Sequence, residues 1–132
     1  MLSTTDQLPI GTIQWMDLTV PDAAPIRDFY AAVAGWRSEP VAMGGYDDYL
    51  MMATGNGEAV AGVCYARGVN ADLPAQWLAY VAVADLDVSL RQCAALGGTV
   101  LTEIKGGDDG ARYAVIQDPV GAVLALIQLG VG

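Results

Sequence analysis

Apolar and polar positions along the chain change between a strand-like and a helix-like period, and the change occurs twice. Residues 11–20 and 76–84 are rich in β-branched and aromatic side chains, which favours strands. Each segment is followed by an aspartate and then by apolar residues spaced three and four positions apart, which is typical of an amphipathic helix. Glycines follow both helical segments, at Gly35 and at Gly97-Gly98. The pattern therefore predicts a strand followed by a helix in each half of the chain.

Each predicted helix begins at an aspartate and has one apolar face. Asp22 is the expected N-cap of the first helix, and Asp85 or Asp87 that of the second. The expected apolar face of the first helix consists of Ile26, Phe29, Tyr30 and Val33. That of the second consists of Leu90, Cys93 and Ala94.

Three more strands are expected after each helix. In the first half they lie near residues 38–43, 47–54 and 58–66, and in the second half near residues 99–105, 111–117 and 122–129. Asn56-Gly57 and Pro119-Val120-Gly121 are the expected turns before the last strand of each half.

The two halves are related by an internal repeat with an offset of 63 residues. Ala31-Ala32-Val33-Ala34-Gly35 returns as Ala94-Ala95-Leu96-Gly97-Gly98, and Ala59-Val60-Ala61-Gly62-Val63 returns as Ala122-Val123-Leu124-Ala125-Leu126. Repetition at a constant offset indicates one supersecondary unit used twice. We therefore expect an α+β fold in which residues 1–132 form a single domain of two βαβββ modules, at about 11–68 and about 75–130.

Composition excludes several classes of function. The chain has 15 acidic and six basic residues, a net charge of −9 and no histidine. This charge disfavours nucleic acid and anionic membranes as partners, and the missing imidazoles exclude histidine-based catalysis and histidine metal ligands. The N-terminal segment lacks the features of a leader and no apolar run is long enough to span a bilayer, so a cytoplasmic location is expected. Cys64 and Cys93 are expected to be reduced thiols.

Several motifs, taken together with the repeat, resemble the vicinal oxygen chelate superfamily, which contains glyoxalases, bleomycin-resistance proteins and extradiol dioxygenases. The resemblance covers about residues 11 to 129. The segments that carry it are Trp15-Met16-Asp17-Leu18-Thr19-Val20-Pro21-Asp22, Phe29-Tyr30, Gly35-Trp36, Ala82-Val83-Ala84-Asp85-Leu86-Asp87, Leu96-Gly97-Gly98 and Gln117-Asp118-Pro119-Val120-Gly121-Ala122. The resemblance implies a cupped mixed sheet and a homodimer, with a closed monomer as the alternative.

The resemblance also implies where metal ligands would lie, on the first and last strand of each module. The corresponding positions are Trp15, Gly62, Leu78 and Ala125. None of these side chains has an atom that binds zinc, iron, manganese or nickel. We therefore expect no metal site and no other cofactor.

Alternation along the strands places Trp15, Asp17 and Tyr80 on the face that would form the cup. Asp17 is the expected carboxylate of an otherwise apolar cavity, available as a general base or as an acceptor for a ligand hydroxyl or ammonium. A structural role remains open for all three, because Asp17 can pair with an arginine or cap amides, and the two aromatic residues can serve as packing. The candidate ligand-binding residues are Trp15, Asp17, Tyr49, Cys64, Tyr80 and Gln117, and the pattern does not fix the faces of Tyr49 and Gln117.

Three functions are compatible with this set. The favoured one is a glyoxalase- or bleomycin-resistance-like protein that has lost the metal site and binds a small, partly apolar or aromatic molecule in the cup. The alternative is a metal-independent enzyme in which Asp17 transfers a proton, as in a lyase or isomerase. A metalloenzyme of the glyoxalase or dioxygenase type would require a different alignment of all four ligand positions. The residues leave open whether any reaction is catalysed.

Overall fold

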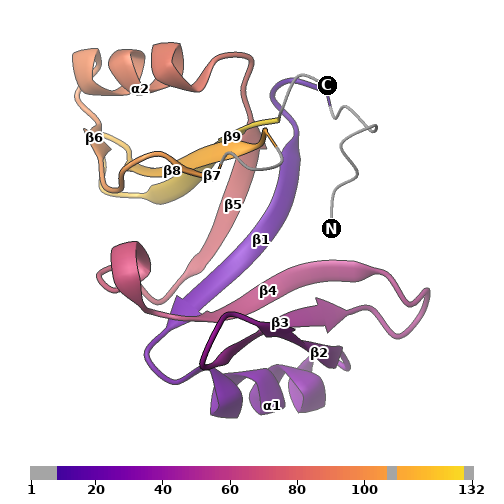
Figure 1. The fold of residues 1–132 in the computed structure, drawn as a ribbon. Helices are drawn as coiled ribbons and strands as arrows, with labels where there is room; N and C mark the ends of the chain where they lie inside the picture. Colours follow the sequence, from indigo (N-terminus) through magenta and orange to yellow (C-terminus); the bar gives the residue numbers. More distant parts are fainter. Residues whose placement is uncertain (1–8, 107–109, 130–132) are drawn as a thin grey trace. The chain divides into compact units, whose positions relative to one another are not determined.

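A computed structural model describes residues 9–106 and 110–129, and this part of the chain contains two α-helices and nine strands (Figure 1). The first half comprises β1 (Ile13–Val20), α1 (Ala23–Val33), β2 (Arg37–Ala42), β3 (Asp47–Met52), β4 (Ala59–Tyr65) and a short 3₁₀ turn at Gly68–Asn70. The second half comprises β5 (Trp77–Ala82), α2 (Leu86–Ala95), β6 (Thr99–Val100), β7 (Lys105–Gly106), β8 (Arg112–Gln117) and β9 (Val123–Gln128). The predicted α+β class and element order are confirmed.

The chain divides into two compact units, one of which spans Trp15–Trp77 while the other joins residues 9–14 to residues 78–129. In the Trp15–Trp77 unit the strand order is β2-β3-β4-β1. The β2–β3 and β3–β4 pairs are antiparallel, and β4 runs parallel to β1 with Gly62 opposite Asp17. Helix α1 lies against one face of these strands (Figure 1).

The core of the Trp15–Trp77 unit lies between α1 and its sheet. The buried side chains are Leu18, Val20, Ala23, Met51, Ala61 and Val63. Met16 packs against them, so Met16, Leu18 and Val20 point to the helix side. The side chains between them, those of Trp15, Asp17 and Thr19, therefore belong to the other face of the sheet.

Helix α1 buries a different face from the one predicted. Ile26 and Tyr30 pack on the core as expected, but Phe29 is 53% exposed and Val33 66% exposed. The buried arc is centred on Ala23 and Tyr30, and Phe29 lies about 100° away around the helix. Phe29 and Val33 thus belong to the apolar stripe but are not buried, because the sheet covers a narrower arc than the stripe.

The second unit repeats the same arrangement. Its strand order is β5-β9-β8-β6, with β7 also paired to β8. Strands β5 and β9 are parallel, and Tyr80 lies opposite Ala125. These two residues follow Asp17 and Gly62 by 63 positions each, so the sequence repeat extends to the pairing register.

The strand expected at 99–105 is interrupted and forms two short strands, β6 and β7. Between them, Thr102 places its hydroxyl oxygen against the ladder, where it accepts a hydrogen bond from Val115 N at 3.0 Å. A side-chain acceptor thus replaces a backbone carbonyl at this point. The ladder breaks there and resumes at Lys105, which pairs with Tyr113.

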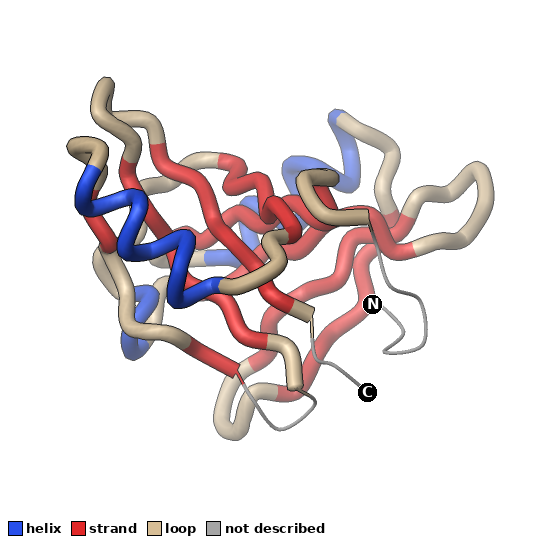
Figure 2. The backbone as a smooth tube through the Cα atoms, turned by 90° about the horizontal axis from the view of Figure 1, so that it is seen from above, coloured by secondary structure: helices blue, strands red, loops and turns tan. Residues whose placement is uncertain are grey.

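The helix N-termini differ although both begin at the expected aspartate. Asp85 accepts a hydrogen bond from Val88 N at 3.2 Å, whereas Asp22 occupies the N-cap position of α1 without a capping hydrogen bond from its side chain. Leu86 is the buried residue of α2. Leu90 and Cys93 of the expected face are half-buried, whereas Ala94 is exposed, which corrects the expectation for that residue. Figure 2 shows the helices and strands from above.

No helix in the described part of the chain has the length and apolar character that crossing a membrane requires.

Candidate functional site

Trp15 and Asp17 form a hydrogen-bonded pair on the face of β1 opposite α1. The indole Nε1 of Trp15 donates to Oδ1 of Asp17 at 2.6 Å, and the pair is partly buried. The pair forms because residues two apart on a strand point the same way. An indole N–H is only a donor, so Oδ1 acts as an acceptor in this contact.

Gly62 makes room for the Asp17 carboxylate. It lies opposite Asp17 on β4, and a Cβ atom at position 62 would collide with Oδ1 of Asp17. The Sγ of Cys64 lies 3.6 Å from the same Cβ position. Asp17 and Cys64 thus flank the space above Gly62, which is occupied by a carboxylate from the neighbouring strand rather than by a side chain of residue 62.

The residues at the implied ligand positions do not fit a metal ion. Trp15 donates its only polar hydrogen to Asp17, Gly62 has no side chain, and Leu78 and Ala125 have no donor atoms. Within the described ranges, no three or more Cys, Asp or Glu side chains group closely enough to hold a metal.

Tyr49 lies on the other face of the same sheet. It packs against the core under α1, and the guanidinium carbon of Arg27 lies 4.5 Å from the centre of its ring. Burial, together with the neighbouring Tyr65, raises the pKa of Tyr49 above its ordinary value. The structure brings Trp15, Asp17 and Cys64 to one face and places Tyr49 on the opposite one.

Tyr80 and Gln117 belong to the second unit and share the face of its sheet opposite α2. On β8, Arg112 binds Asp87 of α2 at 3.1 Å, so Tyr113 and Gln117, with the opposite parity, point away from the helix. The rings of Tyr80 and Tyr113 are 5.7 Å apart. Nε2 of Gln117 donates to Gly121 O at 3.2 Å, so this side chain braces the hairpin that ends β8.

Sequence reasoning missed Tyr113 and Lys105 as candidates. The Nζ of Lys105 lies 5.6 Å from the centre of the Tyr113 ring. Tyr113 has the same strand parity as Gln117, so alternation could have identified it. Lys105 could have been placed on this face in the same way, but its partner could not, because the break at Thr102 moves the pairing of Lys105 from residue 111 to Tyr113.

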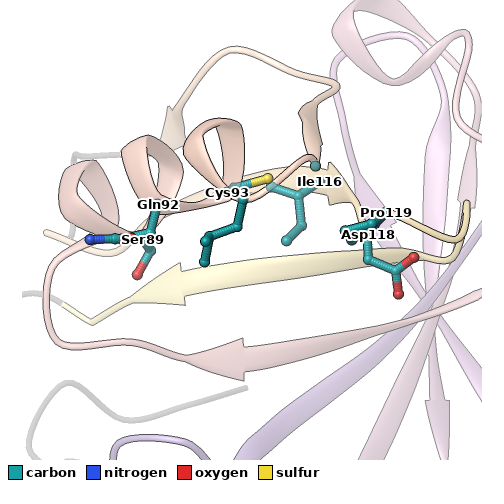
Figure 3. A pocket seen from close by; sticks show the side chains of 8 residues that line it. Ser89, Gln92, Cys93, Ile116, Asp118 and Pro119 are labelled. Atoms are coloured by element: carbon teal, nitrogen blue, oxygen red, sulfur yellow. The ribbon is translucent and has the colours of Figure 1, made fainter.

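A separate pocket of about 210 Å³ lies between α2 and the end of β8 (Figure 3). It is lined by Ser89, Gln92, Cys93, Leu96, Gly98, Ile116, Asp118 and Pro119. The Asp118 carboxylate accepts hydrogen bonds from Val120 N and Ala122 N and so belongs to the hairpin turn. None of the six predicted ligand-binding residues lines this pocket. Both cysteines are half-buried, and neither forms a disulfide with another described residue.

Comparison with known proteins identifies a sequence family. The family described as "Glyoxalase-like domain" matches residues 15–127. CFP32 of Mycobacterium bovis, a candidate glyoxylase, is 34% identical over 119 residues, which is 89% of this chain and 46% of that protein. The anthracycline biosynthesis protein DnrV of Streptomyces peucetius is 31% identical over 133 residues, which is 92% of this chain and 48% of that protein. The chain therefore spans about half the length of the curated relatives it matches.

A solved structure supports the same fold. A glyoxalase/bleomycin resistance protein/dioxygenase superfamily member from Vibrio splendidus matches with a TM-score of 0.58 at 15% sequence identity. The match covers 89% of this chain and 99% of that one. At this identity the likeness concerns the fold alone.

Proposed function

The chain belongs to the glyoxalase-like domain family, and on that basis we propose that it binds a small, partly apolar or aromatic molecule and has lost the family's metal site. The proposed binding surface is the β1–β4 face that carries Trp15, Asp17 and Cys64. The observation that supports it is the hydrogen bond between Trp15 Nε1 and Asp17 Oδ1 beside Gly62. It holds a carboxylate in a fixed direction at a place where the resemblance implies a metal.

The chemistry of this pair favours a ligand with an apolar body and a cationic or hydroxyl group. A carboxylate accepts strong hydrogen bonds from ammonium and hydroxyl donors. The indole of Trp15 adds a large apolar surface beside it and can attract a cation to its ring. The net charge of −9 raises the local concentration of cationic molecules around the whole chain.

Anthracyclines provide a suitable probe of this proposal. DnrV is named for anthracycline biosynthesis, and these compounds combine a flat aromatic body with an amino sugar. Daunorubicin carries the ammonium group, whereas its aglycone lacks it and keeps the aromatic body with its hydroxyl groups. Comparison of the two separates the contribution of Asp17 from that of apolar contact.

The experiment is a fluorescence titration of both compounds against the native chain, Asp17→Asn and the control Asp72→Asn. Asp72 is an exposed residue of the same unit, so its replacement removes the same charge elsewhere. We expect saturable daunorubicin binding that weakens about tenfold in Asp17→Asn, equivalent to about 1.4 kcal/mol. The aglycone, which has no ammonium group, should lose less affinity in this variant. Equal daunorubicin affinities of Asp17→Asn and Asp72→Asn would refute the role of Asp17.

The second candidate is metal-independent proton transfer with Asp17 as the general base. This candidate is favoured because the Asp17 carboxylate lies on a sheet face where the paired residues of β4 are small or apolar. The measurement that tests proton transfer is the exchange of deuterium from solvent into a bound carbon acid such as a 2-oxo acid. Exchange that persists in Asp17→Asn would exclude this residue as the base.

We also propose that two copies of the chain associate. The outer strand β2 pairs only with β3 in the described structure, and Phe29 and Val33 expose apolar surface on α1. Unpaired strand edges and apolar patches favour association. Light scattering coupled to size-exclusion chromatography should give twice the mass of 13.7 kDa, and a mass of one chain at all concentrations contradicts the proposal.

A further inference from the structure

The pocket between α2 and β8 belongs entirely to the second unit and lies on the helix side of its sheet (Figure 3). Its half-buried lining residues are Ser89, Cys93, Gly98 and Ile116, and its other lining residues are exposed. A small molecule can therefore enter it from solvent. The Tyr80 side chain lies on the opposite face of the sheet, so the pocket is separate from the cup face.

The internal repeat relates this pocket to a packed region of the first unit. Cys93 follows Tyr30 by 63 residues, and both lie in the last turn of their helix. The Tyr30 ring packs on the core of the first unit, with the rings of Trp36 and Trp77 at 5.8 Å and 5.2 Å. In the second unit, the residue equivalent to Tyr30 is a cysteine and the residue equivalent to Trp36 is Thr99. The pocket thus corresponds to a position that an aromatic ring fills in the first unit.

The size and walls of the pocket suit one aromatic ring. Its volume is about 210 Å³, and an apolar cavity of about 150 Å³ is large enough to hold benzene. Leu96, Ile116 and Pro119 supply apolar walls. The Cys93 thiol lies against Gly98, where a Cβ atom would be only 2.6 Å from Sγ, so the absence of a side chain at Gly98 leaves space for the thiol. The pocket therefore has room for a single ring with a small substituent.

The polar groups of the pocket favour a neutral ligand with a hydroxyl group. The side chains of Ser89 and Gln92 form no hydrogen bond with any other residue in the described part of the chain. Both can donate and accept hydrogen bonds. Asp118 lies at the other end of the pocket, where its carboxylate is held by the amides of Val120 and Ala122 (Figure 3). This charge, together with the net charge of −9, disfavours an anion in the pocket.

We propose that this pocket binds a small neutral phenol, whose ring takes the position that the Tyr30 ring has in the first unit. Leu96 and Ile116 contact the ring, and the phenol hydroxyl bonds to the free polar groups of Ser89 and Gln92. In the first unit the Tyr30 hydroxyl likewise has a hydrogen-bond partner, the indole of Trp77 at 3.1 Å. The proposal does not depend on the Asp17 surface, because the two sites belong to different units.

The first measurement is the rate at which iodoacetamide alkylates Cys93, followed by mass spectrometry of the peptide that contains it. In this reaction the thiolate sulfur displaces iodide from carbon, and the thiol proton passes to the buffer. The probe is 4-methylphenol, which is the tyrosine side chain as a free molecule. At about ten times its dissociation constant it should slow the alkylation about tenfold, because the thiol reacts only in the empty pocket. Benzoate, which has the same ring and a negative charge, should protect Cys93 much less.

The second measurement compares variants by calorimetry and by the shift of the Ile116 backbone amide resonance on addition of 4-methylphenol. Cys93→Tyr gives the second unit the residue of the first and should fill the pocket, so the affinity should fall at least tenfold. Ala94→Tyr is the matched control, because Ala94 is exposed on α2 and does not line the pocket. This variant and Asp17→Asn should keep the native affinity.

Alkylation of Cys93 that is unchanged by 4-methylphenol overturns the proposal, and so do equal affinities of Cys93→Tyr and Ala94→Tyr. Equal protection by benzoate and by 4-methylphenol overturns the preference for a neutral phenol. If Cys93→Tyr does not fold, the alkylation of the native chain decides, since saturable slowing supports the site and its absence refutes it. Cys64 lies in the other unit, so its alkylation reports separately on the Asp17 surface.

Discussion

Trp15 donates its indole hydrogen to the carboxylate of Asp17 across 2.6 Å, from a position two residues earlier on the same strand. The contact occupies the indole's only donor and orients one oxygen of the carboxylate. Gly62 on the neighbouring strand leaves the space into which that carboxylate extends. Replacement of any one of these three residues should therefore disturb the other two.

Gly62→Ala should displace Asp17 and weaken the protein. The new Cβ would overlap the carboxylate, which must move away and lose the indole donor. Overpacking of this kind costs about 1–3 kcal/mol in the free energy of unfolding. The measurement is urea denaturation, with Gly55→Ala as the control, because a Cβ at Gly55 meets no atom within 4 Å. Equal stabilities of the two variants would show that the space above Gly62 is not restricted.

The indole proton of Trp15 should report the ionisation of Asp17 in an NMR titration. A donor bound to a carboxylate changes its resonance when the carboxylate takes up a proton, because the acceptor loses its charge. The indole of Trp77 donates to the hydroxyl of Tyr30 at 3.1 Å. The resonance of its indole proton should stay constant over the acidic pH range of this titration. Asp17→Asn should abolish the response of Trp15. A response that survives in this variant would assign it to another group.

The two helix caps should differ in their contribution to stability. Asp85→Ala removes an acceptor used by Val88 N, and loss of such a cap costs about 1 kcal/mol. Asp22→Ala removes a side chain that makes no capping hydrogen bond, so the loss should be smaller. Thermal unfolding of both variants checks this order. A larger loss in Asp22→Ala would contradict the observed cap geometry.

Leu86→Ala should be strongly destabilising, whereas Leu96→Ala should have little effect. Leu86 is fully buried at the start of α2, and truncation of a buried leucine costs about 2–5 kcal/mol. Leu96 is 73% exposed just after the same helix, so it is a matched control. Urea denaturation of the two variants gives the comparison. Similar urea midpoints for the two variants would mean that burial of Leu86 does not stabilise the packing of α2.

Alkaline pH should destabilise the chain partly through Tyr49. Burial is the largest cause that raises the pKa of Tyr49 above its ordinary value, and the charge of Tyr65 adds to it. The unfolded chain therefore loses the phenol proton first. The stability that neutral Tyr49 contributes is complete below the unfolded pKa and is lost as pH rises through the folded one. Tyr49→Phe should flatten the alkaline decline of the melting temperature, and an unchanged decline would assign it to other groups.

The sequence by itself determined the elements and their repetition. The 63-residue offset predicts the equivalence of Asp17 with Tyr80 and of Gly62 with Ala125, and the pairing register confirms both. Strand alternation also predicts that Asp17 and its neighbour Leu18 lie on opposite faces of the sheet, and the burial of Leu18 in the core under α1 agrees with this. These features are local, since period and spacing along one chain are enough to specify them.

Only the tertiary structure decided which atoms meet. The alternation that put Trp15 and Asp17 on one face did not reveal their hydrogen bond, because that depends on side-chain torsions and on the space above Gly62. Tyr49 lies under α1 because of the way β3 pairs with β4. Lys105 lies opposite Tyr113 because the ladder is interrupted at Thr102, where the side chain accepts a hydrogen bond. Contacts between strands that are distant in sequence follow from strand register and side-chain packing. The periodicity of a single segment does not specify either of them.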